Sequence, residues 1–305
     1  MRIGINGSGL IATGASLQQL CDHAAAADAQ GFASYWLGQL AVPDALTAIA
    51  VMGARTTRIE LGTAVIPTWA RHPLMLAGQA LTVQQAVGNR LALGIGVGHK
   101  DLIEPALKVT YRKLAQHMEE YLAVLGPAVS DRRVAAVGEI WSGEDDLSHG
   151  TREAATPPVL LAAMGPRMLS LAGRQSDGVI LWLAGPRTIA EAIQPALCEA
   201  AAGRPSRRIV AGLPVCVTDE GSRVRAQVDH VLGKFMHFDS YRTVLEREGA
   251  AGPGDVALVG TAAEVRAGAA ALADAGASDL AATEFVTNRA EAEATRTLLR
   301  ELATT

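Results

Sequence analysis

One stretch decides the fold: RIELGTAVIPTWARHPLMLAGQALTVQQAVGNRLALGIGV, residues Arg58–Val97. Its pattern predicts a strand, a helix and a second strand. Its ends, Arg58–Val65 and Arg90–Val97, are short apolar runs of the kind that form buried strands. Between them a helical pattern begins after His72 and runs from Pro73 to about Val87, and proline suits a first helical turn. A strand–helix–strand unit predicts two parallel strands, because the helix carries the chain back across the sheet.

The same unit recurs on both sides of this stretch. The other expected strands are Arg2–Asn6, Ala33–Leu37, Val159–Ala163, Gly178–Leu183, Arg208–Thr218 and Asp279–Val286. Helical patterns follow at Ser16–Gln30, from Pro43, at Tyr111–Val129, from Pro166, at Pro186–Ala202, at Ala262–Ala275 and at the C-terminus. Eight such units predict a single (β/α)8 TIM barrel over residues 1–305. A doubly wound open sheet is the main alternative, and the count of eight and the lack of a phosphate fingerprint after the first strand favour the barrel.

Two excursions interrupt the repeat. Residues 131–156 form an insertion after the fourth helix, with a short alternating piece followed by polar residues. Residues 219–261 form a long, mostly helical segment between the seventh and eighth strands. We expect substrate specificity to lie in these loops and in residues 100–110, because βα loops carry function in barrels.

Composition and charge exclude several classes of protein. The net charge is −4 and Lys/Arg do not cluster, which argues against a nucleic-acid partner. Apolar stretches fall short of the ~20 residues of a membrane helix, and the opening MRIGING reads as a strand, so we expect a cytoplasmic protein. Three cysteines without CxxC spacing make a disulfide framework or zinc site improbable, and Cys21 and Cys198 are expected to pack within helices.

Three stretches, in this order and spacing, resemble the luciferase-like monooxygenase superfamily. They are Gly31–Leu40 (GFASYWLGQL), the stretch quoted at the outset, and Ala162–Trp182 (AAMGPRMLSLAGRQSDGVILW). The nearest similarity is to its actinobacterial F420-dependent oxidoreductase branch. The resemblance implies a barrel that binds the deazaflavin F420, with FMN as the alternative, and often a homodimer formed through the second and third helices.

The resemblance also implies where a cofactor ring lies. Family members have a bulge with a non-proline cis peptide at the end of the third strand, which places it here at Ala64–Val65, after Thr63. This bulge supports one face of the ring in the family, and ordinary strand packing is the alternative. Asn6 and Trp182, at the ends of the first and sixth strands, complete this part of the expected cofactor site.

A phosphate site is expected where the fifth strand meets its helix. Ala163 and Met164 end the strand, and Gly165, Pro166 and Arg167 begin the helix. A helix N-terminus offers free N–H groups and a positive dipole, and Arg167 adds charge. The alternative is a tight connection with Arg167 on the surface.

His99 and Gln39 are the catalytic candidates. Glycines at 94, 96 and 98 do not match a dinucleotide fingerprint; we expect them to keep the barrel mouth open, with Gly98 and His99 beside the ring. Relatives commonly carry Glu at the position of His99, and an acidic residue followed by His at Gln39 and Leu40. His99 is expected to bind the ring or supply a proton, or to be structural. The absence of a base at Leu40 favours reduction of a substrate.

Trp69 and Arg71 follow the third strand and are expected to line the substrate mouth. Loop packing explains Trp69 equally well. Trp36, inside the second strand, is expected in the core. The scattered histidines offer no metal geometry. The resemblance therefore implies hydride transfer between the C5 atom of F420 and a small molecule with a polarised C=C, C=N or C=O bond. The alternatives are an FMN-dependent monooxygenase and a non-catalytic flavin-binding barrel.

Overall fold

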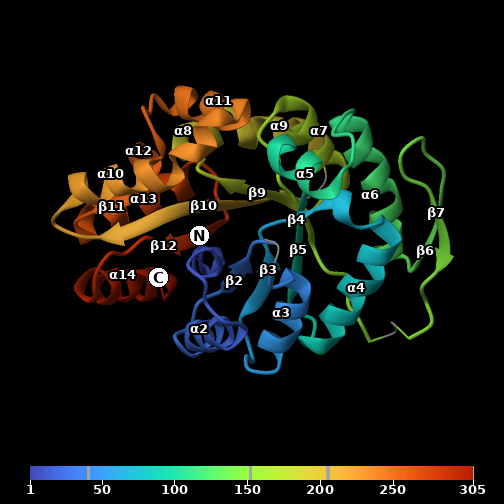
Figure 1. The fold of residues 1–305 in the computed structure, drawn as a ribbon, viewed down its shortest axis with the longest axis horizontal. Helices are drawn as coiled ribbons and strands as arrows, with labels where there is room; N and C mark the ends of the chain where they lie inside the picture. The colour runs from blue at the N-terminus through green and yellow to red at the C-terminus, as the bar shows by residue number, and fades with distance from the viewer. Residues whose placement is uncertain (40–41, 151–152, 204–206, 305) are drawn as a thin grey trace.

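The chain folds into a closed barrel of eight parallel strands, as expected (Figure 1). This computed structural model describes residues 1–39, 42–150, 153–203 and 207–304. The barrel strands are β1 (Arg2–Asn6), β2 (Ser34–Leu37), β3 (Glu60–Thr63), β5 (Leu91–Gly96), β8 (Val159–Leu161), β9 (Gly178–Trp182), β10 (Arg208–Val217) and β12 (Asp279–Glu284). Strand β10 pairs with both β9 and β12, which closes the cylinder and removes the open-sheet alternative.

Helices surround the barrel. The crossover helices are α2 (Leu17–Ala29), α3 (Ala45–Gly53), α4 (Pro73–Ala86), α6 (Leu114–Ser130), α7 (Pro166–Gln175), α8 (Pro186–Thr188), the π-helical turn η2 (Ile189–Ile193), α9 (Gln194–Ala201), α13 (Ala262–Asp274) and α14 (Arg289–Ala303). Two further helices are α1 (Ser8–Ala12) and α5 (Lys100–Leu107), and α5 occupies the segment 100–110 that was expected to be a loop. Both follow a barrel strand directly, so they contribute to the mouth.

Local sequence signals explain where the helices begin. Ser16 and Gln19 form a reciprocal capping box at the start of α2. His72 caps α4 through its Nδ1, which accepts a hydrogen bond from the Leu74 backbone N–H at 3.3 Å, with Pro73 in the first turn. His72 is therefore a helix-entry residue.

The two excursions take different forms. The insertion after α6 is an antiparallel hairpin of β6 (Arg133–Ala136) and β7 (Gly143–Asp146). The segment between β10 and β12 contains α10 (Gly221–Leu232), the 3-10 turn η3 (Gly233–His237), α11 (Asp239–Glu248) and α12 (Pro253–Val256). It also contains a strand not expected from the sequence, β11 (Leu258–Gly260), which extends the sheet beyond the end of β10.

Three local expectations need correction. The third strand is shorter than Arg58–Val65, because β3 ends at Thr63 and a separate two-residue strand, β4 (Ile66–Pro67), resumes the pairing with β5. The helix expected from Tyr111 begins only at Leu114. Cys198 is exposed on α9, whereas Cys21 is buried as expected.

The lower half of the barrel is filled by side chains. At the amino ends of the strands, the Arg208 guanidinium donates to Asp279 and Glu60, with the shortest N–O distance to each at 2.6 Å. Above this network, Trp36 is fully buried, which confirms its place in the core, and it packs with Ala92, Leu160, Ile180, Val210 and Ala281. Any ligand space must therefore lie above this layer, at the carboxyl ends of the strands.

Candidate functional site

The floor of the barrel mouth consists mainly of small residues. Because side chains alternate along a strand, the residues two positions beyond the Trp36 layer also point inward. These are Gly38, Gly94, Ala162, Trp182, Gly212 and Thr283. A Cβ on Gly212 would lie 3.1 Å from the Trp182 ring, so Trp182 lies over this floor. Small residues there leave room for a flat ligand above the core.

The bulge expected at the end of the third strand is present, with a cis peptide between Ala64 and Val65. Both residues are half-buried and pack against the Trp36 layer. Thr63 fastens the bulge to β5, because its hydroxyl donates to the Gly94 carbonyl at 2.7 Å and accepts from the Gly94 N–H at 2.8 Å. Its side chain is fully buried in this role, whereas Ala64 and Val65 are each only partly buried.

The glycines at 94 and 96 leave room for the bulge, and the expectation that they also keep the mouth open stays a prediction. A Cβ on Gly94 would lie 2.0 Å from the Thr63 carbonyl oxygen, and one on Gly96 would lie 3.0 Å from Val65. Gly98 has a φ of +69°, which glycine adopts without strain. The first two glycines are therefore needed by the turn of the neighbouring strand.

Two polar residues stand at the ends of β1 and β2. The Asn6 side-chain oxygen accepts hydrogen bonds from the Ser8 hydroxyl at 2.6 Å and the Ser8 N–H at 3.0 Å. The Gln39 side-chain oxygen accepts from the Ala45 N–H at 2.9 Å, at the start of α3, and the Gln39 N–H donates to the Val65 carbonyl at 3.3 Å. Gln39 thus connects the bulge to α3, while Leu40 lies outside the described residues.

His99 lies in an aromatic cluster above the mouth. Its ring stacks on Phe238 with centroids 4.0 Å apart and planes at 13°, and Tyr241 and Phe235 lie 5.6 and 6.2 Å away. Burial in this cluster lowers the pKa of His99 below its usual value, although Asp101 opposes the shift. His99 is therefore a neutral imidazole at pH 7.

Unpaired polar atoms gather at the same end of the barrel. Among the described residues, three buried side-chain nitrogen or oxygen atoms lack a hydrogen-bond partner: Trp69 Nε1, Arg71 Nη1 and Thr283 Oγ1. Trp69 and Arg71 follow β4, and Thr283 is the penultimate residue of β12. Buried donors are rarely left without a partner, and all three lie toward the carboxyl ends of the barrel strands, the end where TIM-barrel sites form. The sequence gives no signal for Thr283, since only the barrel register brings it here.

Trp69 and Arg71 are also held firmly by their neighbours. Trp69 stacks on His117 with centroids 3.8 Å apart. Arg71 forms an ion pair with Asp44, and its carbonyl accepts from the Tyr121 hydroxyl at 3.0 Å. Stacking on His117 supports loop packing for Trp69, while its contribution to the substrate mouth stays a prediction.

His117 is a buried residue that the sequence did not single out. Its Nδ1 accepts from the Trp141 indole N–H at 3.1 Å, so its Nε2 carries the proton and donates to Thr68 at 2.8 Å. The Thr68 hydroxyl in turn donates to the Gly96 carbonyl at 3.3 Å. Burial lowers the pKa of His117 to about 4. This chain fixes the ring on which Trp69 stacks.

The expected phosphate site lies at the exposed start of α7. Gly165 is the N-cap residue and has no side chain with which to cap the helix. No other residue lies within 4 Å of the position that a Cβ would take. Ala163 is buried, Met164 is half-buried and Pro166 opens the helix. No hydrogen bond or ion pair holds Arg167 to another residue within the described ranges.

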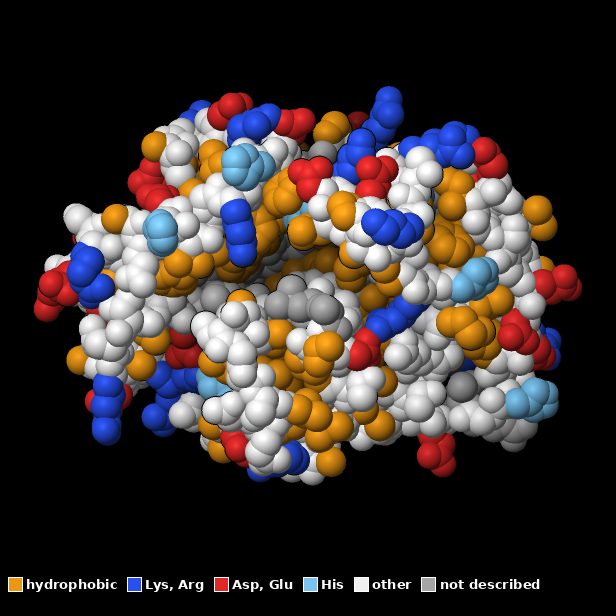
Figure 2. All heavy atoms as spheres, viewed as in Figure 1, with side chains coloured by type: hydrophobic (Ala, Val, Ile, Leu, Met, Phe, Trp, Pro, Cys, Tyr) orange, Lys and Arg blue, Asp and Glu red, His pale blue; other side chains and the backbone are white. Residues whose placement is uncertain are grey.

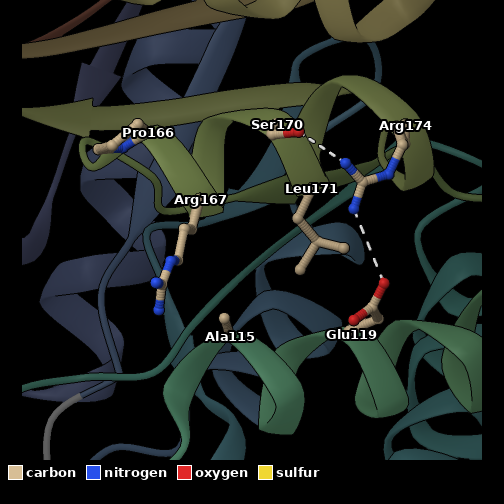
Figure 3. A pocket seen from close by; sticks show the side chains of 7 residues that line it. All are labelled: Ala115, Glu119, Pro166, Arg167, Ser170, Leu171 and Arg174. Carbon is tan, nitrogen blue, oxygen red and sulfur yellow. Dashed lines mark hydrogen bonds and ion pairs between the residues drawn. The ribbon is translucent and has the colours of Figure 1, made fainter.

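A groove of about 380 Å³ continues from this point between α7 and α6. Figure 3 shows the Arg167 side chain extending from α7 toward Ala115 of α6. Arg174 is held by Ser170, at 2.6 Å, and by Glu119, at 3.7 Å. Arg167 is therefore the cation of this groove that is free to meet an anion.

The mouth is visible as a hollow in the molecular surface. Figure 2 shows hydrophobic side chains along its margins, below the region of α11 and α5. Within the described residues, His, Cys, Asp and Glu form no group of three or more that could hold a metal ion. No helix in the same part of the chain is long and apolar enough to cross a membrane.

Comparison with known proteins gives a consistent picture. A model of the luciferase-like monooxygenase family matches residues 3–283. The chain is 26% identical over 235 residues to a 5,10-methylenetetrahydromethanopterin reductase of Methanolobus tindarius, covering 76% of this chain and 71% of that protein. It is 31% identical over 207 residues to an F420-dependent glucose-6-phosphate dehydrogenase of Kineococcus radiotolerans, where the match covers 63% of this chain but only 61% of the relative's length.

Solved structures share the whole fold. A coenzyme F420-dependent tetrahydromethanopterin reductase from Methanopyrus kandleri superposes with a TM-score of 0.81 at 17% identity, over 99% of this chain and 97% of the other. An oxygenating constituent of 3,6-diketocamphane monooxygenase from Pseudomonas putida, in complex with FMN, gives 0.75 at 16% identity, over 99% and 96%. At these identities the likeness shows the fold alone.

Proposed function

The chain belongs to the luciferase-like monooxygenase family, and from this membership we propose that it is an oxidoreductase that uses the deazaflavin coenzyme F420. The observation that carries the proposal is the set of unpaired buried donors at Trp69, Arg71 and Thr283, all at the carboxyl ends of the strands. A planar ring with carbonyl groups, or its substrate, supplies the acceptors that these donors lack. The curated relatives named above support F420 over FMN.

The residues of the mouth fit such a cofactor. The partly buried Ala64 and Val65 would support one ring face, and the open space at Gly165 would admit a phosphate close to the N–H groups of α7. Arg167 adds a positive charge beside it. In this proposal the ring is surrounded by Asn6, Gly98 and Trp182, which lie at or just after the ends of β1, β5 and β9.

When bound, F420 supplies or accepts a hydride at C5. The chain positions the acceptor, a small molecule with a polarised C=C, C=N or C=O bond, on the ring face away from the bulge. His99 and Gln39 are the proposed polar contacts to the reacting groups, and a neutral His99 donates a hydrogen bond rather than a charge. Trp69 and Arg71 contribute to the substrate side of the mouth.

Equilibrium binding of F420 and of FMN tests the proposal. We expect F420 to bind with micromolar or tighter affinity, measured by the change in its fluorescence, and FMN to bind at least tenfold more weakly. Arg167→Gln should weaken F420 binding about tenfold, the scale of one lost charge-assisted hydrogen bond. Arg174→Gln is the matched control, because Arg174 already pairs with Glu119.

Reduced F420 should then be oxidised by one or more members of a panel of enones, imines and ketones. Preferential binding of FMN, with oxygen consumption by the reduced complex, would instead establish the monooxygenase. Binding of neither cofactor would overturn the proposal and leave a barrel without redox function.

Two further properties complete the proposal. The described cysteines are all free thiols, which suits a reducing cytoplasm. Val51 on α3 and Met75 on α4 are exposed apolar side chains on adjacent helices. These two helices are the ones through which we propose that a homodimer forms.

A further inference from the structure

Two of the three unpaired buried donors come from one short loop. Trp69 lies in the 3-10 turn η1 (Thr68–Ala70), between β4 and α4, and Arg71 follows this turn directly. Trp69 Nε1 and Arg71 Nη1 are both buried and have no hydrogen-bond partner in the described part of the chain. The two residues are two positions apart, so their Cα atoms lie within about 7 Å of each other. Both donors therefore belong to one part of the mouth.

Both side chains are held by neighbours on other elements. The Trp69 ring stacks on His117 with centroids 3.8 Å apart, and the Tyr111 ring lies 5.5 Å from it. The Arg71 guanidinium forms its ion pair with Asp44, the N-cap residue of α3. Side chains that are already held lose little conformational freedom when a ligand binds. The two donors are therefore preorganised.

Asp44 uses only part of the Arg71 guanidinium. Its Oδ1 accepts from the Thr47 N–H at 2.9 Å and from the Thr47 hydroxyl at 2.8 Å, and its Oδ2 accepts from Arg71 Nη2. Despite partial burial, these hydrogen bonds and the Arg71 charge lower the pKa of Asp44. The negative charge of Asp44 is thus shared between Arg71 and the start of α3, where the helix dipole also favours it. Arg71 Nη1 is left for a second acceptor.

A second cation lies near the same mouth. Lys234 of η3 is exposed, and its Nζ lies 5.8 Å from the centre of the Phe235 ring. Phe235 in turn lies 6.5 Å from Trp182, whose ring covers part of the floor. An ammonium group at this position makes the electrostatic potential of the mouth more positive. The mouth therefore favours an anion over a neutral molecule of the same shape.

The chemistry of the two donors defines the group that they lack. An indole N–H and a guanidinium N–H only donate, so their partner must accept at two points. A carboxylate has two oxygens and one negative charge, and guanidinium groups bind it with charge-assisted hydrogen bonds. A neutral carbonyl has one oxygen and no charge. A phosphate monoester brings a third oxygen and a charge of nearly −2, which these two donors do not match.

We propose that Trp69 and Arg71 hold a carboxylate of the substrate, with the indole N–H and Nη1 donating to its two oxygens. This inference rests on the proposed function, since it names the substrate class of the same mouth: a carboxylic acid that also carries the polarised bond. The carboxylate is an anchor and takes no part in the hydride transfer. It holds the reducible bond, elsewhere in the same molecule, toward the cofactor.

Ligand binding tests this inference without turnover. The probes are 4-oxo-4-phenylbutanoate, its methyl ester, which has nearly the same shape without the charge, and phenyl phosphate. Each is titrated into the protein alone and into its complex with oxidised F420, with saturation-transfer NMR as the readout. We expect the acid to bind about tenfold more tightly than the ester, the scale of one charge-assisted hydrogen bond. The acid should also bind more tightly than phenyl phosphate.

Two variants assign the effect to these side chains. Trp69→Phe keeps a ring to stack on His117 and removes the indole N–H, so acid binding should weaken about fivefold while ester binding is unchanged. Arg71→Gln removes the charge and should weaken acid binding about tenfold. Arg266→Gln is the matched control, because Arg266 pairs with Glu301 between the outer helices α13 and α14. Circular dichroism confirms folding, and if Arg71→Gln does not fold, Trp69→Phe decides the question.

Equal binding of acid and ester, tighter binding of phenyl phosphate than of the acid, or no binding of the acid overturns the inference. An equal loss of acid and ester binding in Trp69→Phe overturns it as well. Failure of F420 to bind, with acid-selective binding by the protein alone, instead removes the proposed function and leaves the carboxylate site standing. Normal F420 binding without selectivity for the acid removes only this inference, so the two failures are distinguishable.

Discussion

Threonine hydroxyls show how single residues divide between structure and function at the barrel mouth. Thr63 has two hydrogen bonds to Gly94, and Thr68 joins His117 to Gly96. Thr283 is equally close to the mouth but has no partner for its hydroxyl among the described residues. The first two hydroxyls hold the protein together, and we propose that the third serves a ligand.

Thr283→Val should therefore separate stability from binding. Valine has nearly the same shape and removes an unsatisfied buried hydroxyl, so we expect the free energy of unfolding to stay constant or rise by up to about 1 kcal/mol. F420 or substrate affinity should fall by about fivefold. The measurements are urea unfolding and fluorescence titration.

Thr63→Val serves as the comparison for that variant. It breaks both bonds to Gly94 and should destabilise the protein by about 2 kcal/mol. If Thr283→Val lowers stability as much as Thr63→Val does, and leaves ligand binding intact, Thr283 is a structural residue.

His117 should make stability depend on pH. Its pKa is about 4 in the folded protein, because of burial, and about 6.5 when unfolded. As the pH falls below 6.5 the unfolded chain takes up this proton first, so stability present above pH 6.5 is lost toward pH 4. The loss from this group alone reaches about 3 kcal/mol.

Urea unfolding at pH 7.5 and pH 4.5 measures this effect. His117→Gln, which retains a donor and an acceptor but does not titrate, should show a smaller difference between the two pH values. The exposed His149→Gln should behave as the unmodified protein does. Identical pH dependence in His117→Gln and the unmodified protein would contradict the assignment.

At the scale of elements, the bulge between β3 and β4 shapes the mouth. The chain leaves the β5 ladder after Thr63 and resumes pairing at Ile66, opposite Ile95. Gln39 contacts the bulge from β2, and the glycines of β5 give it room. The bulge and the two neighbouring strands therefore act as one unit.

Gly94→Ala should disrupt this unit. The new Cβ would lie 2.0 Å from the Thr63 carbonyl oxygen, which is backbone and cannot rotate away. We expect a loss of about 3 kcal/mol or more in the free energy of unfolding, together with weaker cofactor binding. Gly78→Ala, inside α4 with open space around it, should instead be neutral or stabilising by up to about 1 kcal/mol. Comparable thermal unfolding of the two variants would refute this role of Gly94.

At the scale of the whole molecule, closure of the barrel separates an end held by ion pairs from the end at which we propose a ligand. Arg208 ties β10 to β3 and β12 at the bottom, and it lies 5.4 Å from the Trp36 ring. The mouth at the other end retains unpaired donors and small residues. Because of this difference between the two ends, we place the candidate site only at the carboxyl ends of the strands.

The proposed dimer is a prediction at the same scale. Size-exclusion chromatography with light scattering should give twice the 31.7 kDa mass of one chain. Met75→Glu places a charge on the exposed face of α4 and should yield monomers, because an uncompensated charge opposes burial. Val137→Glu, at a 98% exposed position in the β6–β7 hairpin region, is the control and should remain dimeric. A monomeric unmodified protein would end the dimer proposal.

The sequence by itself determined the barrel, and with it the end of the strands at which we propose the site. Apolar runs such as Arg90–Val97 alternate with helical patterns, and this local periodicity needs no distant contact to be read. The cis peptide at Ala64–Val65 was also predicted, from the resemblance, and is confirmed. Boundaries were less accurate, because α5 and the short β3 depend on what packs above them.

Only the tertiary structure decided which side chains share the mouth and which of them lack partners. Phe238 and Tyr241 belong to an excursion whose sequence carries no motif, yet closure of the barrel places them beside His99. Thr63 and Thr283 are chemically alike, but strand register pairs one hydroxyl and leaves the other free. Hydrogen-bond satisfaction and ring stacking depend on contacts between residues far apart in the chain, which local patterns do not encode.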